Sequence, residues 1–322
     1  MMSDVWQREK QQLDLITVCF VAELNLLRLQ ARSVRMFLEG EILGRIIIVI
    51  NELSSWRVKR AIKRDILPEY GDYAERVVLV TAKDLVGGRL NKCGWGTQQV
   101  LKILASAYAK SPLLMVLDCK NHFIRPVGPD QVWSNDGRIK TRAYRVIPRF
   151  VHYFQAASTY FGVPPNTGMD VALPTTTPFL VPTKLVVDLV AEMEEREDKS
   201  FFEVFMKPKK RFTEFYLIYA FLISKVGSLE ALYDVVANYA VSLMGSHKLD
   251  TDTVYLKVKQ LEQKDVYCFG VHREVLAAGD PKTLAAITQA WQQFGLVNSK
   301  EEAVNFQKVV LKTAKKKFWM LR

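Results

Sequence analysis

The feature that most constrains the fold is a regular alternation between short apolar segments and segments with helical periodicity. Residues 13–21 are β-branched and almost continuously apolar, and residues 24–38 carry apolar side chains three and four positions apart. Further apolar segments follow at 45–50, 77–81 and 113–117, with helical segments between them at 54–66 and 97–110. Strands that are apolar on both faces and separated by helices are typical of a parallel sheet covered on both sides. The sequence therefore predicts an α/β fold with a Rossmann-type, mostly parallel central sheet flanked by helices.

Polar or charged side chains stand at the carboxyl end of every predicted strand. They are Glu23, Asn51 with Glu52, Lys83 with Asp84, and Asp118 with Lys120 and Asn121. Ligands of doubly wound sheets bind at this edge of the sheet. The sequence has neither a GxGxxG turn after the first strand nor a GxxxxGK[ST] loop, so neither of these phosphate-binding motifs identifies the ligand.

The charge of the chain points to an anionic partner. Lys and Arg number 45 against 34 Asp and Glu, which gives a net charge of +11. Phosphate-bearing small molecules, nucleic acid and anionic membranes all fit such a charge. Since 49% of the residues are hydrophobic, the chain can bury a sizeable core, which excludes disorder as a description of the whole.

The cysteines and the apolar runs indicate in which cellular compartment the protein is expected. Cys19, Cys93, Cys119 and Cys268 lie far apart and include no CxxC pair, which favours free thiols in a reducing compartment over a zinc cluster or a disulfide framework. No apolar run reaches the roughly 18 residues that span a membrane. The N-terminus is polar and does not resemble a secretion signal. These features predict a cytoplasmic protein.

The second half of the chain differs in character from the first. Residues 122–182 are rich in proline and aromatic residues, which is typical of loops and short strands. Helices are expected at 183–197, 213–225, 228–243, 281–293 and 300–320, and a strand at 265–270. We predict a main domain over residues 1–275, with halves over about 13–126 and 127–275, and a helical extension with a basic tail over 276–322.

The most informative segment runs from Gly94 to Pro126. It contains a glycine-bounded Trp95, the pair Gln98-Gln99, an apolar helix, and a Leu-Asp-x-x-Asn motif that begins at Leu117. This pattern resembles the donor-site core of GT-A-fold glycosyltransferases, in particular bacterial glycosyltransferase-like proteins whose helix reads WxxQQxxK. The resemblance follows the order of elements over residues 13–275. It implies a GT-A-like domain with a donor half before residue 126 and an acceptor half after it.

The resemblance implies a divalent metal on the donor diphosphate. In the GT-A fold, the acid at the end of the central strand begins an Asp-x-Asp motif that holds Mn²⁺ or Mg²⁺, and a histidine late in the chain completes the site. Asp118 and His272 match these two positions, but Lys120 stands where the second acid is expected. Either Lys120 contacts the phosphates and replaces the charge of the metal, or Asp118 and His272 hold the metal alone. Asp118 could also simply cap its strand.

The resemblance also implies a catalytic base near the start of a helix in this part of the chain. Glu214 follows Thr213, a plausible N-cap. A carboxylate there could deprotonate an acceptor hydroxyl while the helix dipole stabilises its charge, or it could only favour the helix start. Asp170 is the second candidate base, because glycine-flanked loops such as Asn166–Asp170 often shape an acceptor pocket.

The predicted donor-binding residues are Asn51, Glu52, Trp95, Gln98, Gln99, Asp118, Lys120, Asn121, His272 and Arg273. Asn51 and Glu52 end the second strand, where the fold grips the base and ribose of the nucleotide. One of the two glutamines is expected to face the donor and the other the sheet. Trp95 could stack on a base or a sugar, or pack within its loop. An imidazole followed by a guanidinium suits a pyrophosphate.

The C-terminus carries a separate signal. From Lys308 onward the chain has six positive charges, no acid, and the aromatic residues Phe318 and Trp319. Such a segment suits an anionic membrane surface, although it also suits a solvated helix end.

The sequence thus predicts a glycosyltransferase that moves a sugar from a nucleotide-diphosphate donor to a glycan or lipid-linked acceptor in surface polysaccharide or glycoconjugate assembly. It predicts a cytoplasmic enzyme that residues 308–322 hold at the inner face of a membrane, with no nucleic-acid partner. Two alternatives stay open. The missing second acid suggests a non-catalytic relative that binds nucleotide sugars, and the charge suggests a nucleic-acid-binding protein, although no recognition module is visible.

Overall fold

The central sheet is built as the sequence predicts. In the computed structural model, which describes residues 12–88, 90–207, 212–245, 250–304 and 306–307, five strands lie in the order β3-β2-β1-β4-β7. They are β1 (Leu13–Cys19), β2 (Leu43–Ile50), β3 (Val77–Thr81), β4 (Leu113–Val116) and β7 (Phe179–Pro182). The first four are parallel, and β7 is antiparallel to β4. A mixed α/β fold with a mostly parallel central sheet is confirmed.

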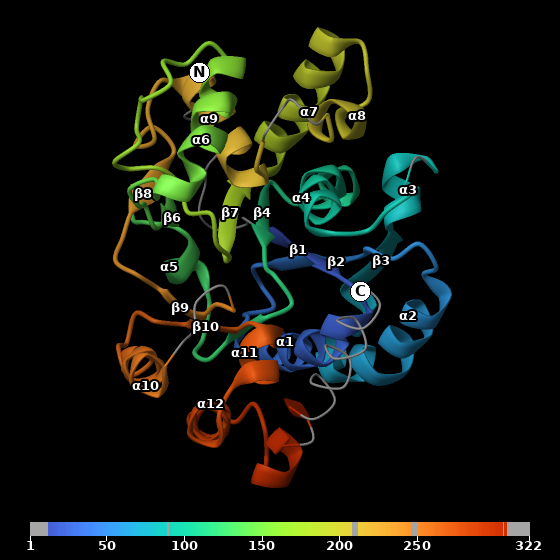
Figure 1. The fold of residues 1–322 in the computed structure, drawn as a ribbon, viewed down its shortest axis with the longest axis vertical. Helices are drawn as coiled ribbons and strands as arrows, with labels where there is room; N and C mark the ends of the chain where they lie inside the picture. The colour runs from blue at the N-terminus through green and yellow to red at the C-terminus, as the bar shows by residue number, and fades with distance from the viewer. Residues whose placement is uncertain (1–11, 89, 208–211, 246–249, 305, 308–322) are drawn as a thin grey trace.

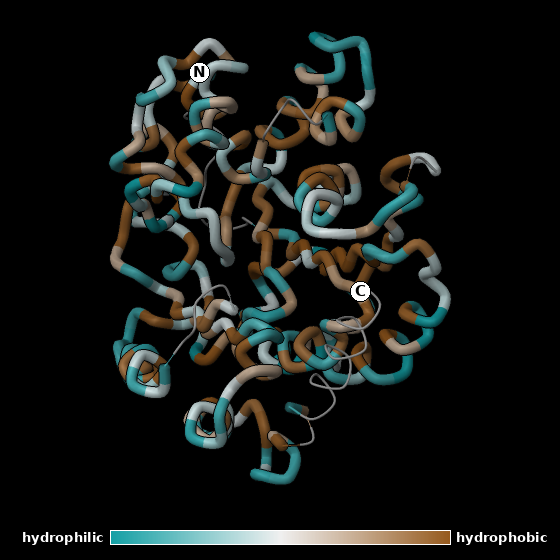
Figure 2. Tube along the Cα trace, in the orientation of Figure 1, coloured by the Kyte–Doolittle hydropathy of each residue, from teal (hydrophilic) through white to brown (hydrophobic). Residues whose placement is uncertain are grey.

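Helices cover both faces of this sheet. Figure 1 shows α1 (Leu24–Phe37) and α2 (Trp56–Ala61) on one face, and α3 (Ala82–Val86) and α4 (Trp95–Leu104) on the other. Figure 2 shows that hydrophobic residues dominate the strands between these two layers. Every residue of β1 is buried, which explains why its sequence is almost continuously apolar.

One buried charge joins three segments of the sheet. Asp14 of β1 is fully buried, and its carboxylate accepts hydrogen bonds from the backbone N–H groups of Arg45 (2.6 Å), Lys110 (2.5 Å) and Ser111 (3.0 Å). The hydroxyl of Ser111 donates a further bond of 2.7 Å. Because four donors satisfy this carboxylate, it ties β1 to the strands on either side instead of destabilising the core.

The second half of the chain adds two smaller sheets and several helices. One sheet has the order β5-β10-β9, with β5 (Asn121–Phe123), β10 (Cys268–Val271) and β9 (Ala240–Leu243), and the other pairs β6 (Ile139–Thr141) with β8 (Tyr233–Val235). The helices are α5 (Pro129–Val132), α6 (Val151–Tyr160), α7 (Thr183–Glu197), α8 (Phe201–Phe205), α9 (Glu214–Val226), α10 (Thr251–Gln260), α11 (Arg273–Ala278) and α12 (Pro281–Gln293). Because β10 lies between β5 and β9, this sheet joins residues far apart in the sequence.

Most of the predicted elements are present. The helices expected at 183–197 and 281–293 are α7 and α12 with the same bounds. The helix expected over 54–66 is α2 followed by a π-helical turn, Ile62–Ile66. The helix expected over 228–243 is wrong, because this segment forms the strands β8 and β9. Its apolar side chains have a helical spacing, but its aromatic and β-branched residues pair with β6 and β10 instead.

The residues after α11 pack against the rest of the molecule. Trp291 of α12 is fully buried and donates its indole N–H to Nε2 of His122 (3.1 Å). Arg32 of α1 donates to the carbonyl oxygen of Leu296 (2.6 Å) and pairs with Glu302 (3.0 Å). The domain boundary at residue 275 remains a prediction.

Two expectations for the C-terminal region fall largely on residues that the structure does not describe. The helix predicted over 300–320 is present at its start, but most of it and the basic tail 308–322 lie outside the described residues. None of the helices in the described part of the chain is both long enough and apolar enough to cross a membrane.

Candidate functional site

A cavity of about 780 Å³ lies where the sequence predicts a ligand site. The residues just beyond β1, β2, β4 and β10 line it, and so do the first residues of α4, α9 and α11. Among the lining residues are Phe20, Glu23, Asn51, Glu52, Leu53, Trp95, Gln98, Lys102, Asp118, Lys120, Glu214, His272 and Arg273. Since the positive end of a helix dipole lies at its first turn, these helix starts favour negative charge beside them.

Four charged side chains form a cluster in this cavity, which we call the lysine–carboxylate cluster: Lys102, Lys120, Asp118 and Glu214. The ammonium group of Lys102 lies 2.7 Å from Oδ1 of Asp118 and 3.0 Å from Oε1 of Glu214. Lys120 pairs with the other carboxylate oxygen of Asp118. The cluster is largely buried, since the side chain of Lys102 is 7% exposed and that of Glu214 is 9% exposed.

The cluster keeps Lys102 and Asp118 charged. Burial opposes ionisation of Asp118, but Lys102 and Lys120 outweigh it and hold the pKa of this carboxyl well below its usual range. Burial would likewise lower the pKa of Lys102, but Asp118 and Glu214 outweigh it and hold this pKa above its usual value. Lys102 therefore contributes a fixed positive charge to the wall of the cavity, next to the carboxylates with which it pairs.

Sequence reasoning missed the role of Lys102. This residue is the lysine of the WxxQQxxK pattern and follows Gln98 by four positions, so that both lie on one face of α4. Gln98 lines the cavity as well. The helical spacing was the signal that could have added Lys102 to the predicted site.

Two buried side chains hold the loop that carries Asp118. Gln30 of α1 donates to the carbonyl oxygens of Asp118 (2.7 Å) and Asn121 (3.1 Å). The hydroxyl of Thr177 accepts from the backbone N–H of Asp118 (3.2 Å) and donates to the side-chain carbonyl of Asn121 (2.9 Å). Asn121 is therefore placed behind the cavity wall, where it fixes the loop.

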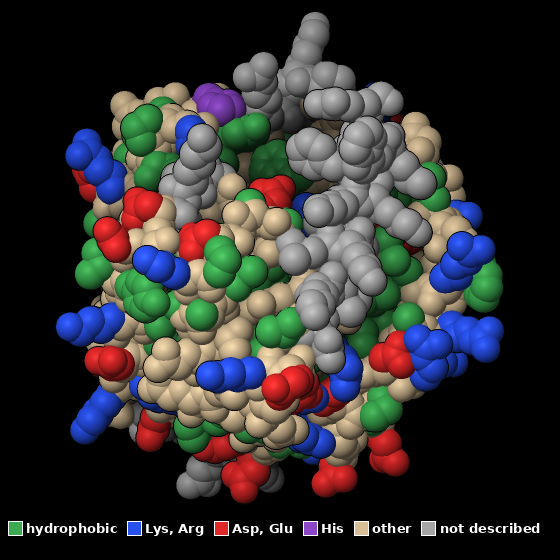
Figure 3. All heavy atoms as spheres, turned by 60° about the horizontal axis from the view of Figure 1, so that its bottom comes forward, with side chains coloured by type: hydrophobic (Ala, Val, Ile, Leu, Met, Phe, Trp, Pro, Cys, Tyr) green, Lys and Arg blue, Asp and Glu red, His purple; other side chains and the backbone are tan. Residues whose placement is uncertain are grey.

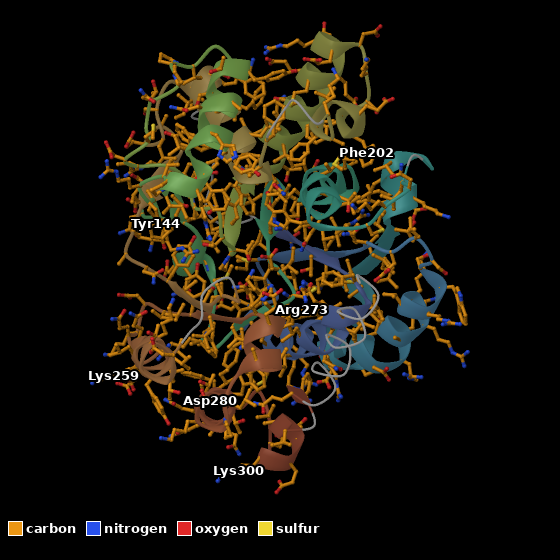
Figure 4. The ribbon with its side chains drawn as sticks, in the orientation of Figure 1. Tyr144, Phe202, Lys259, Arg273, Asp280 and Lys300 are labelled. Atoms are coloured by element: carbon orange, nitrogen blue, oxygen red, sulfur yellow. The ribbon has the colours of Figure 1, made fainter. Side chains whose placement is uncertain are left out.

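A second ion pair stands on another side of the cavity. Nη1 of Arg273 lies 2.6 Å from Oε1 of Glu23, and its guanidinium carbon lies 4.9 Å from the centre of the Phe20 ring. Burial raises the pKa of Glu23, and Arg273 opposes this shift. Figure 4 shows Arg273 near the middle of the molecule, between α11 and the central sheet. The carboxylate of Glu23 therefore fixes the orientation of the Arg273 guanidinium.

His272 caps the helix that carries Arg273. Its Nδ1 accepts a hydrogen bond from the backbone N–H of Glu274 (3.3 Å). Burial, together with the charges of Arg273 and Lys120, lowers the pKa of His272 to about 4. This imidazole is therefore neutral near pH 7.

The predicted metal pair does not fit a divalent cation. Both carboxylate oxygens of Asp118 contact ammonium groups, and Nδ1 of His272 contacts a backbone N–H. A dication at Asp118 would lie next to the positive charges of Lys102 and Lys120, which repel it. Within the described residues, no group of three or more His, Cys, Asp or Glu side chains is placed to hold a metal. The donor set favours the other predicted alternative, in which lysine supplies the positive charge.

The predicted nucleotide-binding residues lie along one side of the cavity. Asn51 accepts a hydrogen bond from the hydroxyl of Thr97 (3.2 Å) and so braces the start of α4. Glu52 accepts from the backbone N–H of Val21 (3.0 Å). Trp95 is 59% exposed, and its ring meets that of Tyr153 edge to face. These side chains are positioned by contacts within the protein and still line the cavity.

Three predicted site residues do not line this cavity. Gln99 is buried on the other side of α4, where its Oε1 accepts from the backbone N–H of Glu214 (3.3 Å). Asn121 is buried in its loop. The side chain of Asp170 is 81% exposed and pairs with Arg145 (3.2 Å). Gln98 lines the cavity whereas Gln99 contacts the start of α9, and the expectation that one glutamine faces the donor and the other the sheet remains a prediction.

A second, smaller cavity of about 390 Å³ adjoins the first, because Thr175 and Thr176 line both. Its other walls come from Tyr144, Arg145, Ile147, Leu173, Pro174 and Tyr216. These residues belong to the part of the chain predicted as the acceptor half. Aromatic rings with a few polar groups are typical of small-molecule sites.

The fold and the site define an α/β protein with a cavity lined by charged side chains at the carboxyl ends of its parallel strands. Residues 18–295 match the family of unknown function DUF6492, and the chain belongs to that family. No protein of curated function matches the sequence.

Among solved structures, the chain is similar to a galactosyltransferase, LgtC, solved in complex with donor and acceptor sugar analogues. The two share 14% identity over 87% of this chain and 99% of LgtC, with a TM-score of 0.46. WbbM, a bifunctional glycosyltransferase, shares 10% identity over 93% of this chain and 52% of its own length, with a TM-score of 0.49. These likenesses are distant.

Proposed function

We propose that this protein is a glycosyltransferase that moves a sugar from a nucleotide-diphosphate donor to a glycan or lipid-linked acceptor. The observation that carries the proposal is the lysine–carboxylate cluster in a cavity at the carboxyl ends of the strands. Such a cavity combines fixed positive charge for a diphosphate with a carboxylate, Glu214, for proton transfer.

The diphosphate of the donor binds to the lysine side of the cluster. Lys102 and Lys120 both line the cavity, and each ammonium group has more donors than its carboxylate partners use. Charge-assisted hydrogen bonds to phosphate oxygens are strong in a buried site, and they strengthen as negative charge develops on the leaving diphosphate. Arg273, oriented by Glu23, provides a further phosphate contact. In this mechanism lysine and arginine supply the charge that a divalent metal supplies in other enzymes of the GT-A type.

Glu214 acts as the base. A hydroxyl oxygen of the acceptor attacks the anomeric carbon of the sugar and forms the new glycosidic bond. The bond from that carbon to the phosphate oxygen breaks, and the nucleoside diphosphate leaves with the electron pair. The hydroxyl proton passes to the carboxylate of Glu214, which stands at the first turn of α9. Asp170 is a weaker candidate, because its exposed side chain lies outside the cavity.

The residues that contact the base, the ribose and the acceptor are assigned from the cavities that they line. Asn51, Glu52 and Trp95 line the cavity, and we assign them to the base and ribose of the donor. The adjoining smaller cavity would bind the acceptor, with the rings of Tyr144 and Tyr216 against its sugar or lipid-linked portion. A cytoplasmic location at the inner face of a membrane remains part of this proposal.

A panel of nucleotide sugars tests the proposal through release of nucleoside diphosphate. Wild-type protein is expected to turn over one donor, and Glu214→Gln to lose on the order of a hundredfold or more in turnover. Glu214→Gln should still be stabilised by the same donor in thermal unfolding. Retained turnover in this variant would exclude Glu214 as the base, and the absence of any donor effect on wild-type protein would contradict the proposal.

A second candidate is a non-catalytic protein that binds nucleotide sugars. It is favoured by the ion pair between Glu214 and Lys102, which occupies one oxygen of the proposed base. Stabilisation by a nucleotide sugar, without turnover on a range of acceptors, would support this candidate.

A further inference from the structure

The helical segment formed by α2 and the turn Ile62–Ile66 has two very different sides. Its inner side is apolar and buries Val58, Ile62 and Ile66. Its exposed side carries Trp56, Arg57, Arg60, Lys63 and Arg64. This side therefore presents four cations and an aromatic ring. Within the described part of the chain, an acid pairs with Arg64 (Asp65, 2.6 Å) but with none of the other three cations.

Exposed apolar side chains lie at the start of this helix, in the loop before it and in the turn after β1. Trp56 is 57% exposed, Leu53 is 47% exposed and Val21 is 49% exposed. The hydrogen bond from the N–H of Val21 to the carboxylate of Glu52 joins the turn after β1 to the loop that carries Leu53. We call the exposed side of the helix, together with Leu53 and Val21, the α2 face. In Figure 3, Lys and Arg side chains gather at the edge of the molecule on the side where α2 lies in Figure 1.

We propose that the α2 face binds the surface of a membrane that contains anionic lipids. Each Lys or Arg near such a surface strengthens binding about fivefold. A tryptophan prefers the boundary between headgroups and acyl chains, and exposed aliphatic side chains can enter the same layer. Arg57 lies 5.4 Å from the centre of the Trp56 ring, so the charge and the ring face the same surface.

The apolar side chains decide between a membrane and a nucleic acid. A phosphate backbone would attract the same cations, but it offers no apolar layer to Leu53 and Val21. A bilayer satisfies both the charges and the apolar side chains.

The position of the α2 face places the cavity beside the membrane. Leu53 and Ser54 immediately precede α2 and also line the cavity. Binding through this face would therefore bring the cavity close to the surface from which a lipid-linked acceptor is taken. This last point rests on the proposed function, whereas membrane binding itself does not depend on it.

Vesicle sedimentation tests the proposal with the full chain. The test variant is Arg57→Glu, Arg60→Glu and Lys63→Glu combined. The control is Lys259→Glu, Lys264→Glu and Lys282→Glu, which makes the same change in charge on exposed residues in the region of α10 and α12, away from α2 (Figures 1 and 4). A second test variant, Trp56→Ala with Leu53→Ala, leaves the charge unchanged. Thermal unfolding of each variant establishes that the protein is folded.

We expect wild-type protein to bind vesicles of phosphatidylcholine and phosphatidylglycerol in equal amounts, and not vesicles of phosphatidylcholine alone. The charge variant should lose on the order of a hundredfold in partitioning, while the control keeps most of its binding. The apolar variant should bind less tightly than wild type. Equal losses in the charge variant and the control, or no loss in either, would overturn the proposal. Binding of single-stranded oligonucleotides that depends on the α2 face, without vesicle binding, would also overturn it.

Discussion

Lys102 is the residue whose replacement should most disturb the site. Its ammonium group lies between two buried carboxylates, and breaking a buried ion pair leaves uncompensated charge. Lys102→Met should therefore lower the free energy of unfolding by about 3 kcal/mol. Denaturant unfolding measures this loss.

A matched variant checks that the loss comes from charge. Lys102→Met leaves Glu214 without its lysine, whereas Asp118 keeps Lys120. Adding Glu214→Gln removes this unpaired charge, so the double variant should lose less stability than the sum of the losses in the two single variants. Lys102→Met with the stability of wild-type protein would contradict the ion-pair geometry.

Two histidines, His122 (buried) and His272 (half-buried), predict how stability depends on pH. Burial lowers the pKa of His122 to about 3, and burial with neighbouring cations lowers that of His272 to about 4, against 6.5 in an unfolded chain. Below pH 6.5 the unfolded chain therefore binds protons that the folded protein does not. The free energy of unfolding should fall by about 1.4 kcal/mol per pH unit for each histidine as the pH drops from 6.5 toward 4.

Replacing one histidine separates this effect from other titrating groups. His122→Gln should reduce the slope of unfolding free energy against pH by about one proton between pH 4 and 6.5. An unchanged slope in a folded variant would show that His122 is protonated in the native protein as well.

At the scale of residues, a polar residue directly after a buried strand was the most reliable sign of a site residue. Asp118 and Lys120 were predicted because they follow a buried strand, and both line the cavity. Asp170 was predicted from a glycine-flanked loop, a local feature that says nothing about distance from the cavity. Lys102 was not predicted, because it lies within a helix and not at the end of a strand.

At the scale of elements, Asp14 shows how a polar residue in an apolar strand can fix the sheet. Asp14→Ala would leave the N–H groups of Arg45, Lys110 and Ser111 without their acceptor in a buried region. We expect a loss of about 3 kcal/mol in the free energy of unfolding, because unsatisfied buried donors each cost about 1 kcal/mol or more. Thermal and denaturant unfolding measure it.

Asp14→Asn provides the matched control, since an amide oxygen still accepts part of these bonds. It should be more stable than Asp14→Ala. Equal stability of the two variants would show that the hydrogen bonds of Asp14 do not hold the strands together.

Helices whose apolar spacing lies within one segment were predicted well. Strands that depend on pairing with segments far away in the sequence were not. α7 and α12 have the predicted bounds because their apolar spacing and helix starts are encoded within each segment. β8 and β9 were predicted as helix, because the apolar spacing of that segment also fits a helix. Their partners β6 and β10 decide the conformation, and the segment alone does not reveal these partners.

At the scale of the whole molecule, the cavity depends on two sheets. The central sheet supplies Asp118 and Lys120, and the smaller sheet supplies His272 and Arg273 through β10. The pairing of β5 with β10 links residues 121–123 to 268–270 and brings these groups together. The sequence predicted these residues as members of the site. It did not predict the contacts that they make with Glu23 and within the lysine–carboxylate cluster, because these contacts depend on the tertiary structure.

The most direct test is calorimetric titration of the protein with nucleoside diphosphates in the presence of a metal chelator. We predict that one of UDP, GDP, CDP and ADP binds without metal, and that Lys120→Met weakens its binding about tenfold or more, because it removes a charge-assisted contact to the phosphates. Binding that appears only when Mn²⁺ or Mg²⁺ is added would contradict the lysine-based phosphate site. The absence of binding by all four, with or without metal, would contradict the proposed function itself.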